Sequence, residues 1–312
     1  MPTTTLQTLD LAGLQALMAH AAREGWNPGD GDARAFHRTD PDGFIARCVD
    51  GQFAAGISVV RYTADQAFLG LYIADPARRG QGHGMALWRA ALEAFDGVTV
   101  GLDGVVEQQA NYARSGFVFS HRNVRWQGTV TGAVSGALTG TDPGLSARPP
   151  TRADLDGLIR LDAQVGGFAR DRFIETWCLH GEEDGRRTLL VERDGDAVGV
   201  GTIRRCAGPY KLGPLLAPDA DTARTLIQAL VGTAVRGMSG SVAGGTMPGG
   251  PADRAADPIE VTLDVPEPNR AAVALVERLG FSPVFEAARM YRGTAPHIDT
   301  DRLFGVATLE LG

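Results

Sequence analysis

The sequence predicts an α+β protein with two domains, in each of which helices flank a central, mixed but mostly antiparallel sheet. The first reason is length, because 312 residues exceed the roughly 100–200 residues of an ordinary domain. The second is an internal repeat, since three pairs of similar segments occur in the same order in both halves. The third is that each half alternates strand-like and helix-like patterns. We place the domains at residues 1–143 and 144–312.

The first and last pairs of similar segments each combine a strand with a helix. Residues 6–18 and 148–161 begin extended and continue with apolar residues at helical spacing. Residues 113–126 and 277–291 share Arg-x-Gly-Phe, which predicts a helix that ends at glycine and a strand that follows it. The same order in both halves indicates a duplicated unit.

The middle pair of segments predicts a hairpin in each half. Residues 46–61 and 190–204 carry Asp-Gly at positions 50–51 and 194–195, between apolar and β-branched runs. Asp-Gly is typical of the tight turn that joins two antiparallel strands. We therefore expect corresponding hairpins.

Two stretches are rich in glycine and small residues. Residues 128–144 carry no charge before Asp142, which indicates a weak edge strand followed by a linker, with the domain boundary near Gly144. Residues 236–258 are poor in large apolar side chains, so we expect a loop within the second half.

Composition limits the classes of function. A net charge of −7 argues against a nucleic-acid partner, and no apolar run reaches the roughly 20 residues that span a bilayer. Because the N-terminus lacks a signal-peptide pattern, we expect a cytoplasmic monomer or homodimer without a membrane partner. Cys48, Cys178 and Cys206 are too far apart for a zinc site or a disulfide framework, so we expect buried thiols and no metal.

A glycine-rich loop at residues 78–84 (RRGQGHG) separates a strand-like segment, 68–73, from a helix expected over 85–95. Unpaired backbone N–H groups at a helix N-terminus attract an anion, and the helix dipole adds to the attraction. Glycine lets a phosphate approach the backbone closely. The loop therefore predicts binding of a pyrophosphate group.

Two nucleotide-binding patterns fit this loop less well. It lacks the Gly-Lys-Ser/Thr of a Walker P-loop. A Rossmann site is the stronger alternative, because glycines 80, 82 and 84 precede a helix, a strand and Asp103. A Rossmann loop, however, turns directly from the strand into its first glycine, whereas residues 74–79 intervene here.

The spacing Arg79-x-x-Gly82-x-Gly84 within residues 73–84 (IADPARRGQGHG) resembles the acetyl-CoA motif of the GNAT superfamily of N-acetyltransferases. Residues 112–117, a tyrosine followed by Gly-Phe, are also similar to that family, although its usual Asn-x-x-Ala ahead of the tyrosine is absent. The whole chain resembles a bacterial tandem-GNAT protein with a diverged C-terminal domain.

The resemblance implies that backbone groups of residues 71–73 pair with the pantetheine arm of acetyl-CoA and polarise the thioester carbonyl. It also implies that amides of residues 79–84 hold the pyrophosphate, with arginine side chains offsetting its charge. The expected cofactor-binding residues are Leu71, Tyr72, Ile73, Arg78, Arg79, Gly80, Gln81, Gly82, His83, Gly84 and the neighbouring Asn111.

Acyl transfer to an amine needs a proton for the leaving thiolate and a base for the amine. By resemblance, Tyr112 is the general acid, although a packing role for it is the alternative. Asp103 or Glu107 is the expected base, with His121 or a water chain as further possibilities. Trp26, in a turn-rich segment after the first helix, is expected to contact substrate.

The second half departs from the motif. Residues 211–218 (KLGPLLAP) stand in place of the phosphate loop, and Pro214 and Pro218 remove backbone donors. Val276 stands where the tyrosine would be. We therefore expect a degenerate domain that acts as a scaffold or as part of the substrate pocket.

These observations predict an acetyl-CoA-dependent N-acetyltransferase that acts on a primary amine of a small-molecule acceptor. The alternative is an acyl-CoA-binding sensor or regulatory protein without turnover, which the poorly defined base favours.

Overall fold

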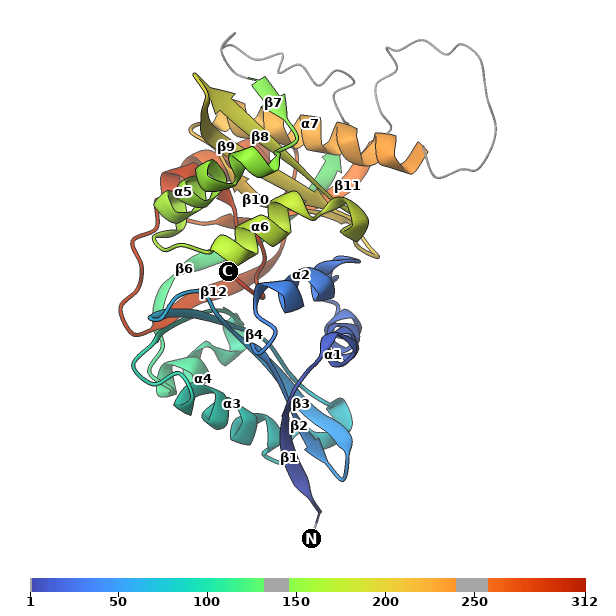
Figure 1. Cartoon of the computed structure of the whole chain (residues 1–312), viewed down its shortest axis with the longest axis vertical. Coiled ribbons are helices and arrows are strands. Elements are labelled where there is room, and N and C mark those ends of the chain that lie inside the picture. The colour runs from blue at the N-terminus through green and yellow to red at the C-terminus, as the bar shows by residue number, and fades with distance from the viewer. Residues whose placement is uncertain (1, 132–145, 240–257) are drawn as a thin grey trace.

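The computed structural model describes residues 2–131, 146–239 and 258–312 and shows one continuous sheet with helices on both faces (Figure 1). The first half contains β1 Thr4–Thr8, α1 Leu11–Arg23, α2 Asp32–Thr39, β2 Phe44–Val49, β3 Gln52–Arg61, β4 Gln66–Ala74, α3 His83–Glu93, β5 Thr99–Val105, α4 Gln109–Arg114 and β6 Val118–Val130. The second half contains β7 Ser146–Arg148, α5 Leu155–Gly166, α6 Asp171–Leu179, β8 Arg186–Arg193, β9 Asp196–Arg204, β10 Tyr210–Leu216, α7 Ala220–Ser239, β11 Ile259–Pro266, α8 Arg270–Arg278, β12 Ser282–Arg292 and β13 Leu303–Gly305. Apart from β13, the two halves share one order of strands and helices, which confirms the α+β class and the duplication.

The two halves exchange their last long strands. The strand order is β1-β2-β3-β4-β5-β12-β6-β11-β10-β9-β8-β7, so β12 from the second half lies between β5 and β6 of the first. Strand β6 in turn lies between β12 and β11. These three junctions are antiparallel, whereas β4–β5 and β10–β11 are parallel. The two expected sheets are therefore one 13-stranded sheet.

The prediction of a weak edge strand within residues 128–144 is wrong for residues 128–130. Residues 128–130 belong to β6 at the centre of the sheet, where Gly128 pairs with Val261. A side chain at Gly128 would collide with the Phe281 ring, so packing explains this glycine. The rest of that stretch and the predicted domain boundary near residue 144 lie outside the described residues.

The turn predictions are confirmed in both halves, and the expected loop at 236–258 needs a correction. The two-residue turns have positive φ throughout, 49° and 76° at Asp50 and Gly51 and 53° and 86° at Asp194 and Gly195. This conformation matches the twist of the paired strands, and Asp-Gly adopts it readily. Of residues 236–258, the first four belong to α7 and residues 240–257 are not among those described.

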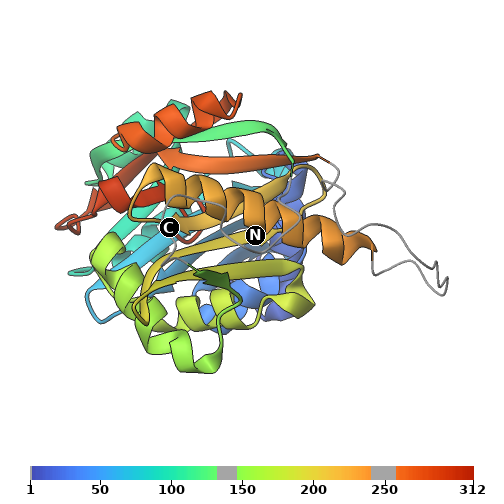
Figure 2. The same ribbon diagram turned by 90° about the horizontal axis from the view of Figure 1, so that it is seen from above.

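The helices pack on both faces of the sheet. Helices α1 and α2 share a single apolar cluster with α5 and α6, in which Phe36, Phe173 and Trp177 lie at the centre. Figure 2 shows α7 and α8 on the other side of the strands from α5 and α6. Because the first cluster draws side chains from both halves, the halves share a core. Cys48, Cys178 and Cys206 are buried, as expected.

Two buried arginine–aspartate pairs join the exchanged strands to their neighbours. Arg289 on β12 donates from Nε and Nη2 to the Asp103 carboxylate on β5, at 2.8 and 2.7 Å. Arg125 on β6 donates in the same bidentate manner to Asp264 on β11, at 2.7 and 2.9 Å. The sheet register makes the pairs equivalent, since each arginine lies directly opposite its aspartate. Because they are bidentate and buried, these pairs are strong side-chain contacts between the exchanged strands and their neighbours.

We expect Arg289→Met to lower the free energy of unfolding by about 3–5 kcal/mol, because it leaves the Asp103 carboxylate buried without its cation. The double variant Arg289→Met/Asp103→Asn should recover part of that loss, since no unpaired charge then remains. Urea unfolding monitored by circular dichroism measures both. The matched control is Arg122→Met, whose ion pair with Glu286 joins β12 to its other neighbour, β6, at 3.3 Å, with the two side chains 32% and 48% exposed. It should cost about 1 kcal/mol or less. Equal losses in Arg289→Met and Arg122→Met would contradict this assignment.

Candidate active site

The cavity of the first half begins where β4 and β5 diverge. The two strands pair from Gln66 and Thr99 to Leu69 and Leu102, and their pairing stops there. Beyond it, a bulge places two β4 residues, 71 and 72, opposite one residue of β3, with Leu71 at a φ of 45°. Backbone groups of this part of β4 therefore face a gap instead of a neighbouring strand.

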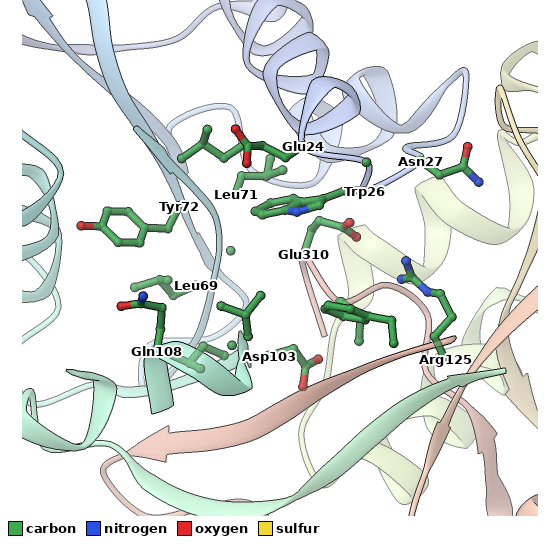
Figure 3. Close-up of a pocket in the computed structure, with 18 of the residues that line it drawn as sticks. Glu24, Trp26, Asn27, Leu69, Leu71, Tyr72, Asp103, Gln108, Arg125 and Glu310 are labelled. Atoms are coloured by element: carbon green, nitrogen blue, oxygen red, sulfur yellow. The ribbon is translucent and has the colours of Figure 1, made fainter. Parts of the chain in front are cut away.

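A cavity of about 790 Å³ fills this gap and extends toward the second half. Figure 3 shows Tyr72 and Gln108 at one end and Trp26, Glu310 and Arg125 at the other. Strand β4 lines it with residues 69–74, so the predicted Leu71, Tyr72 and Ile73 all border the cavity. A ligand in this cavity would therefore lie along the edge of β4 that β5 leaves unpaired.

The glycine-rich loop lies at the start of α3. Gly80 and Gly82 have φ values of 76° and 82°, a region that favours glycine, and a Cβ at either position would meet nothing within 4 Å. Gly82 is the N-cap of α3 and makes no side-chain cap bond, so the first N–H groups of the helix are left for another acceptor. A Cβ at Gly84 would lie 2.8 Å from the Tyr72 hydroxyl, so a larger residue there would have to displace the end of the Tyr72 side chain. The arrangement fits a pyrophosphate.

The side chains of this loop have partners within the protein. Arg78 donates to the Gln52 amide oxygen at 2.8 Å, and Arg79 pairs with Glu24 and donates to the carbonyl of residue 74 at 3.2 Å. Gln81 donates to the carbonyl of residue 77 at 3.2 Å. Arg79 also lines the cavity, whereas His83 forms the first turn of α3.

Asn111 lies on the exposed side of α4, away from the cavity lining. Its amide donates to Gln108 at 2.5 Å, and its oxygen accepts from Arg114 at 2.6 Å. Gln108 is the member of this group that borders the cavity. In this conformation the Asn111 side chain is occupied by its own helix.

Tyr112 borders the cavity and packs against an aromatic ring. It stacks on Trp88 with ring centroids 5.4 Å apart, and Trp88 in turn lies 5.1 Å from Tyr72. A Cβ at Gly104 would collide with the Tyr112 ring, so glycine on β5 makes room for it. Burial raises the pKa of Tyr112 to about 12, and the phenol therefore keeps its proton at neutral pH.

Of the possible bases, Asp103 borders the cavity. Burial raises its pKa, while Arg289 and the Asn123 amide, which donates at 2.8 Å, act in the opposite direction. Glu107 lies exposed in the 3-10 helix Val106–Gln108 and does not reach the cavity lining. His121 is buried beside Ser120, outside the lining, and burial lowers its pKa to about 3.

The far end of the cavity is built from residues that the loop motif does not reveal. Trp26, for which the sequence predicts contact with substrate, lines the cavity, and Asn27 also lines it. The remaining wall comes from the exchanged strand β6 and the second half, with Arg125, Lys211, Thr262, Val284, Phe285 and Glu310. These residues come from separate strands and a distant segment, so no local spacing identifies them. The internal repeat does carry one signal. Arg125 follows Gly116-Phe117 at the same distance as Arg289 follows Gly280-Phe281, so the two arginines occupy equivalent positions in the two halves.

The equivalent gap in the second half is filled by the chain itself. Strands β10 and β11 pair as far as Leu212 and Leu263 and then diverge. Strand β13 lies in the gap and pairs with β10, and the N–H of Val306 donates to the Asp264 carbonyl at 2.9 Å. Residues 211–216 are therefore part of β10 and not a replaced phosphate loop, and residues 217–219 alone lead into α7. The gap between the two parallel strands is thus open in the first half, between β4 and β5, and filled by β13 in the second half, between β10 and β11.

No helix in the described ranges is long and apolar enough to cross a membrane. Within the same ranges, no group of three His, Cys, Asp or Glu side chains is arranged to hold a metal ion.

Known proteins resemble both halves. Residues 11–117 match the acetyltransferase (GNAT) family, and residues 158–238 and 253–305 match the acetyltransferase (GNAT) domain. A curated relative, holothin acyltransferase from Pseudoalteromonas sp. (strain SANK 73390), is 29% identical over 310 residues, which are 99% of this chain and 95% of the relative.

Two solved structures share the fold along nearly the whole chain. One, from Pyrococcus horikoshii and assigned as an acetyltransferase, is 19% identical with a TM-score of 0.72 and covers 99% of this chain and 96% of its own. The other, a tandem GNAT protein from the clavulanic acid biosynthesis pathway, is 16% identical with a TM-score of 0.61 and covers 95% and 100%. With a GNAT match in each half and a relative that covers both, the chain belongs to the GNAT acyltransferases as a tandem of two GNAT domains.

Proposed function

We propose that this protein is an acetyl-CoA-dependent N-acetyltransferase that acetylates a primary amine of a small acceptor, with a single active site in the first domain. The observation that carries the proposal is the contrast between the two strand gaps. The β4–β5 gap is open and lies beside the glycine loop, whereas the β10–β11 gap holds β13. As the sequence predicts, we take the location to be cytoplasmic.

The residues of the first domain fit coenzyme A. The N–H groups at the start of α3 would bind the pyrophosphate, helped by Arg79. Backbone groups of residues 71–73 would pair with the pantetheine arm, since β5 leaves that edge of β4 free. The cofactor supplies the acetyl group as a thioester, whose carbonyl a backbone N–H at the β4 bulge would polarise.

Tyr112 and Asp103 are the groups best placed to move protons. The Tyr112 hydroxyl borders the cavity and is protonated, so it can donate to the departing thiolate sulfur. The Asp103 carboxylate can accept the amine proton directly or through a water. The two side chains come from α4 and β5, and both border the cavity near the place where residues 71–73 would hold the thioester.

The cavity also limits the acceptor. Its volume of about 790 Å³ must hold the end of the pantetheine arm together with the acceptor, which favours a small molecule. The curated relative is named for its action on holothin. Holothin therefore belongs in the panel of amines to be tested by thiol release, together with amino acids, polyamines, aminoglycosides and peptide N-termini.

We expect Gly82→Trp to weaken acetyl-CoA binding at least about 100-fold, because the indole fills the space above N–H groups that each contribute about 1.5–3 kcal/mol to an anion. Isothermal titration calorimetry measures the change in Kd. The control is Gly97→Trp, which has a similar φ of 77° and equally free surroundings but lies after the far end of α3. It should leave the Kd within about threefold. Unchanged acetyl-CoA consumption by Gly82→Trp would refute the assigned cofactor site.

We expect Tyr112→Phe to lower kcat about 100-fold while acetyl-CoA affinity stays unchanged, which is the usual size of a general-acid contribution. Because the pKa of Tyr112 lies near 12, the wild-type phenol should remain protonated from pH 6 to 10 and cause no loss of kcat in that range. Phenylalanine keeps the ring that stacks on Trp88, so a packing role predicts an unchanged kcat. Tight acetyl-CoA binding by the wild type without thiol release from any amine would favour a sensor.

A further inference from the structure

The far end of the cavity carries charged side chains that the acyl-transfer chemistry above does not use. Glu310 and Lys211 come from the second half and are 7% and 3% exposed, and Arg125 comes from the exchanged strand. All three border the same cavity as residues 71–73 of β4. Arg125 is paired with Asp264, but Glu310 and Lys211 form no ion pair among the described residues. Buried charges without such partners are costly, and their presence in a cavity indicates a ligand with matching groups.

The carboxylate of Glu310 is held in place before any ligand arrives. The N–H groups of Glu310 and Leu311 donate to Thr308 Oγ1 at 2.9 and 3.2 Å, and the Thr308 hydroxyl donates to Glu310 Oε2 at 2.5 Å. The Tyr62 hydroxyl donates to the Leu311 carbonyl at 2.6 Å. The backbone of Glu310 lies against Gly70, where a Cβ would collide with it. This segment therefore fixes Glu310 beside the point where β4 leaves β5.

Each of the three charged groups keeps hydrogen-bonding capacity for a ligand. Within the part of the chain that the structure describes, Glu310 Oε1 accepts no hydrogen bond and Glu310 forms no ion pair. Lys211 donates to the Trp26 carbonyl at 2.8 Å and has two further N–H groups. Arg125 uses Nε and Nη2 for Asp264, which leaves Nη1. The cavity thus offers one anionic acceptor and two cationic donors.

The remaining walls of this end are apolar. Trp26, Val284, Phe285 and Leu309 border the cavity there, and the Arg125 guanidinium lies 5.5 Å from the centre of the Phe285 ring. Val284 and Phe285 are also 53% and 38% exposed, so they form the mouth of the cavity. A ligand with an apolar body and polar groups at one end matches this distribution.

We propose that Glu310 binds the ammonium group of the acceptor, and that Lys211 and Arg125 bind a carbonyl or carboxylate oxygen a few bonds away on the same molecule. The acceptor class is then an apolar amine with a neighbouring carbonyl, as in an α-amino acid or its amide. This inference rests on the proposed N-acetyltransferase function and names its substrate class. It also gives the second domain a direct part in recognising the acceptor.

The charge state of Glu310 agrees with this assignment. Burial acts to raise the pKa of Glu310, but Lys211, Arg204 and the Thr308 hydroxyl outweigh it and hold that pKa below its usual value. The carboxylate is therefore ionised at neutral pH, where an aliphatic amine is an ammonium ion. Glu310 is a binding and positioning group here, and Asp103 remains the group that takes the proton.

The test compares two probes that differ in one group, phenylalaninamide and phenethylamine, by kcat/KM in the thiol-release assay with acetyl-CoA. Each charge-assisted hydrogen bond contributes about 1.5–3 kcal/mol, or about 10- to 150-fold. The wild type should therefore prefer phenylalaninamide by at least about 10-fold. Glu310→Gln should lower kcat/KM for both probes by a similar factor. Lys211→Met should lower it for phenylalaninamide alone and so reduce the preference.

The control is Glu286→Gln, which removes a 48% exposed carboxylate on β12 and should leave both probes within about twofold. Acetyl-CoA affinity, measured by calorimetry, should be unchanged in every variant. Glu310→Gln behaving like Glu286→Gln would overturn the inference. So would a wild type that turns over other amines but shows no preference between the probes or accepts neither. A different result would contradict the proposed function itself, namely that no amine of any class causes release of the coenzyme A thiol from acetyl-CoA. The wild-type comparison of probes does not depend on the stability of any variant.

Discussion

The architecture depends on the two buried arginine–aspartate pairs that hold the exchanged strands. The Arg289–Asp103 pair joins β12 to β5, and the Arg125–Asp264 pair joins β6 to β11, so each exchanged strand is tied by a buried ion pair to a neighbouring strand from the other half. Without the exchange, two separate sheets would present their edges to solvent. With it, the second half supplies a wall of the cavity that opens in the first. The ion pairs therefore connect the stability of the sheet with the composition of the site.

Duplication provided two equivalent gaps between parallel strands, and the chain uses them differently. In the second domain β13 fills the gap, so that backbone hydrogen bonds replace those a ligand would make. In the first domain the gap stays open, and the segment that follows β13 reaches its edge at Gly70. One continuous C-terminal segment thus closes one gap and lines the other. The glycine-rich loop at residues 78–84 lies in the first domain, beside the open gap. This is consistent with the division, since a gap filled by β13 needs no site for the pyrophosphate of a cofactor.

The local features of the chain could be predicted from sequence, because local chemistry determines them. Asp-Gly turns, the loop at residues 78–84 and the helix after it depend on φ preferences and apolar spacing within a few residues. The strand exchange depends on pairing between residues far apart in sequence. A strand has the same hydrophobic pattern whichever strand it pairs with, so this pattern does not reveal the exchange. The glycine at 128 shows this ambiguity, since a small residue suits a weak edge as well as a crowded centre next to Phe281. Lys211 and Glu310 escaped prediction for a related reason, because each looks like an ordinary charged residue until folding buries it beside the cavity.

The duplication also separates structural roles from catalytic ones. A feature present at the same place in both halves serves what the halves share, which is the joined sheet, and the two arginine–aspartate pairs belong to this class. Asp264 has its backbone carbonyl bonded to Val306 in a filled gap, so its role is structural, and Asp103 must meet the same structural demand before it can serve as a base. The glycine loop and Tyr112, by contrast, lack counterparts in the second half, where residues 217–219 and Val276 stand instead. On this argument Tyr112, the proposed proton donor, is better defined than Asp103, the proposed base.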